Sequence, residues 1–268
     1  MSRAVPRWMW ASALAVYLFL YLPLLVVVVF SFNDSKLNAE WVGFTTAWYA
    51  KLFRNSEMLT AARNSLLIAL VAALVSTALG TMAGFALHKY RMRVLPVLVV
   101  APIAIPEILM GVALLMFFVL LNVTLGLVSI ALSHIAFCIG YVALVVRARL
   151  AGMDESLVEA ARDCGATPRA AFRYITLPLI LPFIFIAGMI RLIDALKSFD
   201  IIFAITQGGP GSASETINLY LYSVAFVYYD IGYGSAIAVV FFVLIIILAA
   251  VMLYFRQRFH WNEAGGGA

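Results

Sequence analysis

Long apolar runs separated by short polar connections make up most of this chain. Each run is long enough to cross about 30 Å of hydrocarbon as a helix. Six such runs predict six transmembrane helices, at about residues 8–31, 60–88, 94–121, 126–149, 176–206 and 231–255. The pattern therefore predicts an all-α integral membrane protein in which residues 1–268 form a single transmembrane domain.

The orientation of the predicted helices follows from the distribution of Lys and Arg. On one side of the bilayer lie Arg3 and Arg7, then Lys89, Arg91 and Arg93, then a cluster from Arg147 to Arg173, then Arg256 and Arg258. On the other side, basic residues are balanced by acidic ones, and the connection 207–230 contains no Lys or Arg at all. Basic residues prefer the cytoplasmic side. Both termini are therefore predicted to be cytoplasmic.

Composition supports the same class. Hydrophobic residues make up 65% of the chain and charged residues 12%, which excludes an ordinary soluble domain. The net charge of +5 needs no nucleic-acid partner, because the basic residues fall where the cytoplasmic connections are expected. Cys138 and Cys164 have no metal-ligand spacing to the three histidines, so we predict no metal site. The first apolar run is longer than the core of a signal peptide, and we expect it to be retained.

The polar stretch 154–175 interrupts this pattern on the cytoplasmic side. Ser156 and Glu159 have the spacing of a capping box at a helix start. Gly165 suits a helix end with a left-handed backbone, and Thr167 followed by Pro168 suits a second helix start. We therefore predict an elbow of two short helices joined at the glycine.

This elbow resembles the EAA signature of permease subunits of bacterial ABC importers. The resemblance rests on Glu159-Ala160-Ala161, then Gly165, then Ile175-x-Leu177-Pro178. It implies the type I ABC importer permease fold, in which the elbow is a cytoplasmic coupling helix docked on an ATPase. The implied coupling residues are Leu157, Val158, Glu159, Ala160, Ala161, Gly165, Leu177 and Pro178. The alternative is a plain helical hairpin.

The resemblance also implies the partners. These are a cytoplasmic ABC ATPase dimer that binds ATP and Mg, a second permease subunit that we expect to be a homologous but different chain, and an extracytoplasmic solute-binding protein. The chain has no G-x-x-x-x-G-K-[ST] phosphate loop, so we predict neither enzymatic activity nor a cofactor of its own. The expected location is the bacterial inner (plasma) membrane, where ATP would drive alternating access.

Five charged residues within the predicted spans are candidates for the substrate path. Ionisable residues inside a membrane are costly and usually face a cavity or a partner. The candidates are Glu107, which follows Pro102 and Pro106, and the series Arg191, Asp194, Lys197 and Asp200 at intervals of three. Neighbours at this interval can also pair with each other. The two interpretations, path lining and pairing within the bundle, both stay open.

Two resemblances point to different substrates. The segment from Ser31 to Tyr49 and the first two-thirds of the chain resemble spermidine/putrescine-type permeases. The motif around Gly208, Gly209, Pro210 and Gly211 resembles an outer loop of sugar-importer permeases, where it would approach a partner, although an ordinary tight turn is the alternative.

The charged residues of the predicted fifth span favour one of these substrates. Fixed positive charge on Arg191 and Lys197 opposes a polyamine unless it is neutralised. The prediction is therefore a carbohydrate or polyol, with a polyamine as the alternative. A proton-coupled secondary transporter using Glu107, Asp194 and Asp200 is a further rival, disfavoured because the chain has no visible internal repeat.

Overall fold

A computed structural model describes residues 6–90 and 93–258 of the chain. Arg3 and Arg91, used above for orientation, lie outside the described residues. Within them the chain is helical, and the only extended pairing is an isolated bridge between Asn33 and Phe44. The chain divides into two compact units, residues 1–59 with 220–244 and residues 60–219 with 245–268.

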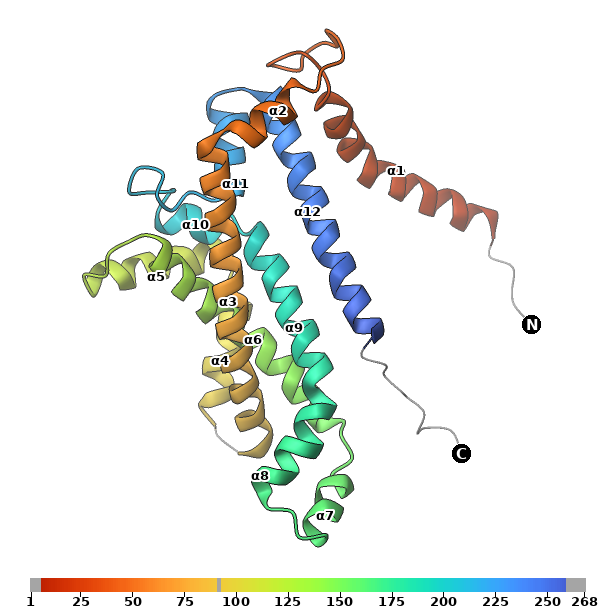
Figure 1. Ribbon diagram of the computed structural model, residues 1–268, viewed down its shortest axis with the longest axis vertical. Coiled ribbons are helices and arrows are strands. Elements are labelled where there is room, and N and C mark those ends of the chain that lie inside the picture. The colour runs from red at the N-terminus through yellow and green to blue at the C-terminus, as the bar shows by residue number, and fades with distance from the viewer. Residues whose placement is uncertain (1–5, 91–92, 259–268) are drawn as a thin grey trace. The chain divides into compact units, whose positions relative to one another are not determined.

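Five helices of the described chain are long and apolar enough to cross a membrane, and a bent helix pair supplies a sixth candidate. The five are α1 (Arg7–Phe30), α3 (Ser56–Lys89), α6 (Leu127–Ala151), α9 (Leu177–Lys197) and α12 (Ile231–Arg258). The short helix α8 (Pro168–Ala171) and a π-helical turn, Phe172–Thr176, lengthen α9 at its start. The pair is α4 (Leu95–Ala104) and α5 (Glu107–Leu120) (Figure 1). The all-α membrane fold predicted from the sequence is confirmed.

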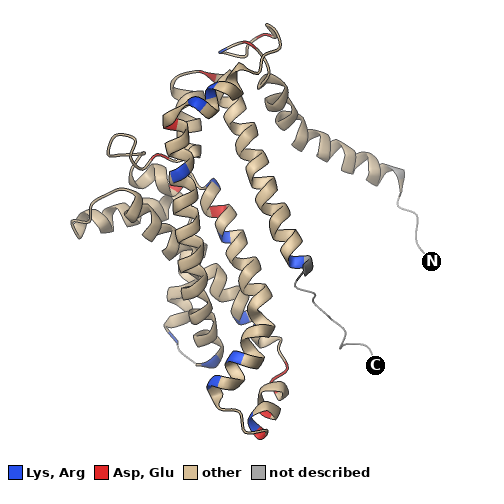
Figure 2. Ribbon diagram, viewed as in Figure 1, with Lys and Arg blue, Asp and Glu red and all other residues tan. Residues whose placement is uncertain are grey.

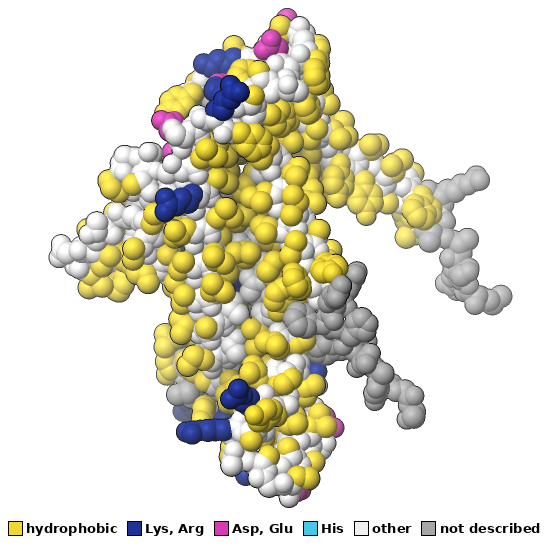
Figure 3. All heavy atoms as spheres, viewed as in Figure 1, with side chains coloured by type: hydrophobic (Ala, Val, Ile, Leu, Met, Phe, Trp, Pro, Cys, Tyr) yellow, Lys and Arg dark blue, Asp and Glu magenta, His cyan; other side chains and the backbone are white. Residues whose placement is uncertain are grey.

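Apolar side chains remain exposed along these helices, as a lipid-facing surface requires (Figure 3). Leu70 and Leu74 of α3 are 53% and 63% exposed, and Phe19 of α1 is 79% exposed. Side chains of this size are rarely exposed in such numbers on a soluble protein. The helices therefore carry their apolar surface toward lipid or toward other subunits.

The predicted third span is broken. Ile105 has an extended backbone, which is the preferred conformation of a residue before proline. Pro106 is the N-cap of α5, and the two helices are bent by 117°. The break makes Glu107 the first residue of a new helix, where the helix dipole favours a negative charge.

The first unit contains α1, α2 (Ala47–Arg54) and the connection 31–46 between them, here called the outer segment. It also contains a π-helical turn, Ser223–Val227, and the start of α12. Asn33 is buried and organises the outer segment: its amide donates to Glu40 O at 2.7 Å, and its side-chain oxygen accepts from the N–H of Val42 at 2.8 Å. Lys51 pairs with Asp230 at 3.2 Å and lies 4.1 Å from the ring centre of Tyr233.

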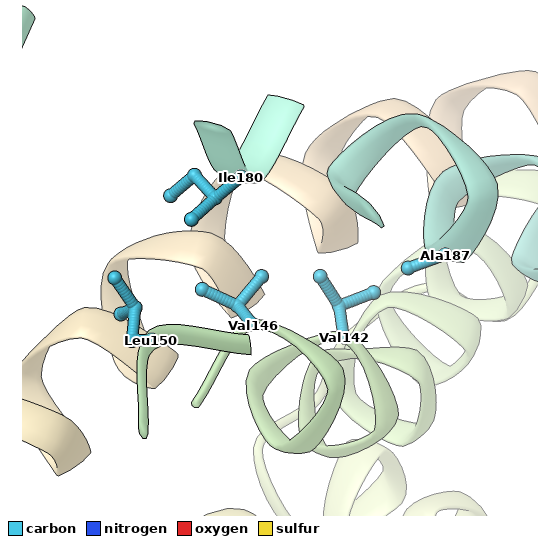
Figure 4. Close-up of a cluster of buried hydrophobic side chains, with 5 residues drawn as sticks. All are labelled: Val142, Val146, Leu150, Ile180 and Ala187. Atoms are coloured by element: carbon cyan, nitrogen blue, oxygen red, sulfur yellow. The ribbon is translucent and has the colours of Figure 1, made fainter. Parts of the chain in front are cut away.

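The core of the second unit lies between α6 and α9. Figure 4 shows Val142, Val146 and Leu150 of α6 directed at Ile180 and Ala187 of α9, and each of these side chains is at most 2% exposed. Helix α3 also approaches α6 closely, because of a glycine. A Cβ at Gly84 would lie only 2.6 Å from Ala143 O. Small residues of this kind let helix backbones pack tightly in membranes.

The predicted fifth span, 176–206, was wrong at its C-terminal end. The helix ends at Lys197, Ser198 is extended, and a separate short helix, α10 (Asp200–Ile205), follows. Asn218, at the start of α11 (Ile217–Tyr222), donates its amide to Lys197 O, which satisfies a carbonyl freed at the helix end. The apolar residues that suggested a longer span, including Ile201 and Ile205, are buried against α5.

Candidate functional site

All five predicted path residues line one cavity in the second unit. The cavity has a volume of about 450 Å³ and receives Glu107 from α5, Arg191, Asp194 and Lys197 from the end of α9, and Asp200 from α10. Figure 2 shows the charged bands of α9 together at the end farthest from the elbow. Glu107, Lys197 and Asp200 are exposed, so the cavity is open at the surface of this chain.

Asp194 is shared by two cations. One of its oxygens accepts from Arg191 Nη2, and the other lies 2.9 Å from Lys197 Nζ. The residues are three apart on α9, the spacing at which helix side chains are neighbours. Arg191 is buried and stacks on Tyr141, with 4.0 Å between the guanidinium carbon and the ring centre. Pairing therefore occurs among Arg191, Asp194 and Lys197, which also line the cavity, and that this cavity is the substrate path stays a prediction.

Glu107 and Asp200 have no ion pair within residues 6–90 and 93–258. Asp200 does not continue the pairing along α9, because that helix has already ended. Gly111 brings the two acidic helix starts to the same cavity. A Cβ at Gly111 would lie 2.8 Å from the side chain of Ala204, so only glycine lets α10 lie this close to α5.

Five other residues, not predicted from the sequence, complete the lining of the cavity. These are Ile103, Phe137, Tyr141, Ser198 and Phe199. Phe137 and Tyr141 are four apart on α6 and so share one face of that helix. A tyrosine on the same helical face as a second aromatic ring, inside a span, was the available signal for Tyr141.

The elbow consists of α7 (Ser156–Asp163) and α8 (Pro168–Ala171). Its glycine joint is as predicted: Gly165 has a φ of +89°, its N–H donates to Arg162 O at 2.9 Å, and the N–H of Ala166 donates to Ala161 O at 3.0 Å. This pattern is a Schellman motif. Thr167 also caps as predicted, accepting from the N–H of Ala170 at 3.3 Å.

The predicted capping box at the start of the elbow does not form. Ser156 is already the first residue of α7, one position past the cap, and its N–H donates to Asp154 Oδ1 at 2.9 Å. Asp154 therefore takes the capping role assigned to Ser156. Hydrogen bonds from Ser156 lower the pKa of Asp154 below its ordinary value.

The second helix of the elbow is not separate from the fifth span, as the prediction of two short helices required. A π-helical turn, Phe172–Thr176, joins α8 to α9. Leu157 is 46% exposed at the elbow surface, and Glu159, Ala160, Gly165 and Pro178 are also exposed. The remaining predicted coupling residues, Val158, Ala161 and Leu177, are half-buried.

The outer loop with the Gly-Gly-Pro-Gly motif is a tight turn held by its own chain. Ser214 is buried and donates to Gly209 O at 2.6 Å, and its N–H donates to Gly208 O at 3.0 Å. Gly208 and Gly211 have positive φ values of +89° and +61°. Pro210, also in the predicted loop site, is exposed between them. A contact between this loop and a partner stays a prediction.

Apolar spans, a broken third span and a cytoplasmic helical elbow define an integral membrane transport protein. Residues 76–261 match the family described as "Binding-protein-dependent transport system inner membrane component", and the chain belongs to this family. It is a multi-pass inner-membrane permease subunit of an ABC importer. This membership excludes the proton-coupled secondary transporter considered above.

Relatives in Escherichia coli (strain K12) carry polyamine names. The chain is 39% identical over 195 residues to the putrescine transport system permease protein PotI, covering 69% of each chain. It is 37% identical over 197 residues to the spermidine/putrescine transport system permease protein PotC, covering 72% of this chain and 73% of the relative. The predicted carbohydrate substrate receives no support from these relatives, which favour the polyamine alternative.

Solved structures share the fold at low sequence identity. A bacterial ABC transporter involved in the import of the acidic polysaccharide alginate has a TM-score of 0.76 at 17% identity, covering 94% of this chain and 96% of that one. The methionine ABC transporter MetNI has a TM-score of 0.63 at 19% identity, covering 81% and 99%. These likenesses confirm the predicted type I importer permease fold and carry no information about the substrate.

Proposed function

We propose that this chain is a permease subunit that imports a polyamine such as putrescine. The observation that carries the proposal is the charge of the cavity. Three carboxylates and two cations line it, and both cations are held by the single carboxylate of Asp194. The carboxylates of Glu107 and Asp200 remain available to bind a linear diammonium ion. The polyamine names of the relatives point to the same chemistry.

This arrangement removes the objection raised from the sequence. Arg191 and Lys197 would oppose a cationic substrate only as unpaired charges. Their shared partner neutralises part of that charge, and the guanidinium of Arg191 is also packed against the Tyr141 ring. Aromatic rings also attract ammonium groups, and Phe137 and Phe199 lie in the same lining.

The partners follow from the class of transporter. In our proposal, a separate ATPase dimer binds ATP and Mg and docks on the elbow through Leu157 and the exposed residues Glu159 and Ala160. A second permease subunit closes the open side of the cavity, and an extracytoplasmic binding protein delivers the polyamine. ATP-driven movement of the elbow then alternates access to the cavity.

Uptake of labelled putrescine by the complete transporter tests the proposal. The host strain must lack its other polyamine importers. We expect putrescine uptake that Glu107→Gln and Asp200→Asn each reduce by about tenfold, the effect of losing roughly one favourable ionic contact. The matched control is Asp34→Asn, which removes an exposed carboxylate that is not among the lining residues of the cavity.

Either of two results would overturn the proposal. One is uptake of a neutral sugar or polyol without putrescine uptake by the same transporter. The other is putrescine uptake that neither cavity variant changes, since the carboxylates would then have no part in recognising the substrate.

A further inference from the structure

The two cations bound to Asp194 differ in how firmly they are held. The side chain of Arg191 is 11% exposed and is fixed against the Tyr141 ring. The side chain of Lys197 is 57% exposed, and its Nζ lies 2.9 Å from the second oxygen of Asp194. Exposed lysine–carboxylate pairs contribute little stability, whereas buried arginine pairs are costly to break. Asp194 therefore has one permanent partner and one that can leave.

The backbone at Lys197 does not need to move for the side chain to leave. Lys197 is the last residue of α9, and its carbonyl oxygen accepts from the amide of Asn218. The next carbonyl, that of Ser198, accepts from the same amide at 3.5 Å. These contacts fix the end of the helix, while the four-carbon stem of the lysine can rotate toward solvent.

A lysine side chain ends in the same group as a diamine: a primary ammonium on an alkyl chain. The position of Lys197 Nζ beside Asp194 therefore also suits the ammonium group at one end of a polyamine. The neighbouring carboxylates of Glu107 and Asp200 line the same cavity and have no ion pair within the described parts of the chain. They are available to the other ammonium.

We infer that Lys197 is an internal competitor for the substrate: its ammonium occupies Asp194 in the empty cavity and is displaced by one ammonium of the incoming diamine. This inference rests on the proposed polyamine function. Lys197 is thereby a specificity-determining residue. A ligand must exchange one ammonium for another at Asp194, which a neutral solute cannot do and a monoamine can do at one end only.

Displacement can be separated from a simple effect of charge. Lys197→Met keeps the length of the side chain and removes the competitor, but it also makes the cavity more negative. Lys197→Arg keeps the charge and replaces the ammonium by a guanidinium, which binds a carboxylate through two parallel hydrogen bonds and is harder to displace. A simple charge effect would therefore leave the arginine variant equal to wild type, whereas displacement predicts a weaker one.

The measurement is the affinity for labelled putrescine of the purified complex containing this chain, in lipid nanodiscs and without the binding protein. We expect affinity to rise about two- to fivefold in Lys197→Met and to fall by a similar factor in Lys197→Arg, the range set by an exposed ion pair. Lys51→Met and Lys51→Arg are matched controls, because Lys51 forms a comparable pair with Asp230 outside the cavity. Thermal unfolding of each complex checks that it remains folded.

The outcomes distinguish the two proposals. Suppose that wild type binds putrescine. If the affinity is then unchanged in Lys197→Arg, or does not rise in Lys197→Met, the competitor role is overturned and the polyamine function still stands. If wild type neither binds nor imports putrescine, the polyamine function fails and the competitor role fails with it.

Discussion

The glycine joint of the elbow offers a prediction in which backbone conformation can be isolated from packing. Gly165 has a φ of +89°, and a Cβ built at this position meets no atom within 4 Å. Gly165→Ala therefore adds no steric clash with neighbouring atoms. What it adds is the cost of holding a residue with a Cβ in the left-handed region, about 1–2 kcal/mol.

This strain acts on the proposed contact with the ATPase. The Schellman hydrogen bonds from Gly165 and Ala166 set the direction in which the chain leaves α7. If the ATPase binds only this form of the elbow and alanine lets the free elbow relax out of it, association weakens by up to the full strain energy. A cost of about 1–2 kcal/mol corresponds to about a 5- to 30-fold loss of affinity.

The assay is co-purification of the ATPase with the permease, together with ATP turnover stimulated by the loaded binding protein. Gly152→Ala is the control for added volume, because Gly152 ends α6 with an ordinary φ of −96° and its Cβ would meet nothing closer than 3.7 Å. Gly165→Asn should restore much of the association, since asparagine enters the left-handed region more readily than alanine.

Two results would refute this reasoning. Wild-type association and turnover in Gly165→Ala would show that the joint conformation is irrelevant to coupling. Equal damage from alanine and asparagine would show that any side chain at this surface is harmful, which is a steric explanation and not a conformational one.

Three further predictions concern stability and local structure. Gly84→Ala should destabilise the folded chain by about 1–3 kcal/mol and so lower its thermal unfolding midpoint, because the added Cβ would lie 2.6 Å from Ala143 O. Gly43→Ala, whose Cβ would have no neighbour within 4 Å, should leave the midpoint unchanged. Asn64→Leu should make the outer loop more susceptible to proteolysis, because the Asn64 amide holds Ala213 O and Glu215 O at 3.1 and 2.9 Å, and unchanged digestion would contradict this. The pKa of Asp154 is lowered in the folded chain, so its stabilisation of α7 is complete above the ordinary value of 3.8 and lost as pH falls through the lowered pKa. Hydrogen exchange of the first amides of α7 should show lower protection in Asp154→Ala than in wild type at neutral pH, because alanine has no acceptor for the Ser156 N–H. Equal protection in variant and wild type would disprove the capping role.

The elbow was predictable because its determinants are local. A glycine that needs a positive φ and a Thr-Pro helix start act through hydrogen bonds within a few residues, so the sequence pattern contains them. The error at Ser156 was a shift of one position: the helix begins at Ser156, and Asp154 supplies the acceptor. Helix starts with several candidate caps in a row are ambiguous to this extent.

The cavity was only partly predictable because its geometry depends on contacts distant in sequence. The interval of three correctly indicated that Arg191, Asp194 and Lys197 can pair. It failed for Asp200, because α9 ends where Asn218, about twenty residues further on, binds the free carbonyl. The place of Tyr141 beneath Arg191 depends in the same way on the packing of α6 against α9.

The carbohydrate prediction, which the relatives do not support, depended on charges counted from the sequence. From composition alone, two cations within a span argue against a cationic substrate. The outcome depends on whether they have separate counter-ions or share one, and only the three-dimensional arrangement shows that Asp194 serves both. Net charge at a site is thus a property of the fold as much as of the residue list.

The π-helical turn at Phe172–Thr176 has a mechanical consequence. It keeps the chain helical from Pro168 to Lys197, a stretch of 30 residues and about 45 Å. One helix therefore joins the elbow, at its start, to the charged cavity, at its end. By simple geometry from that length, a tilt of about 5° at the elbow displaces the far end by about 4 Å. Asp194 lies on this helix, whereas Glu107 and Asp200 belong to other helices. In the proposed mechanism, a small rotation of the helix at the cytoplasmic surface therefore changes the distances between the carboxylates that would hold a diamine.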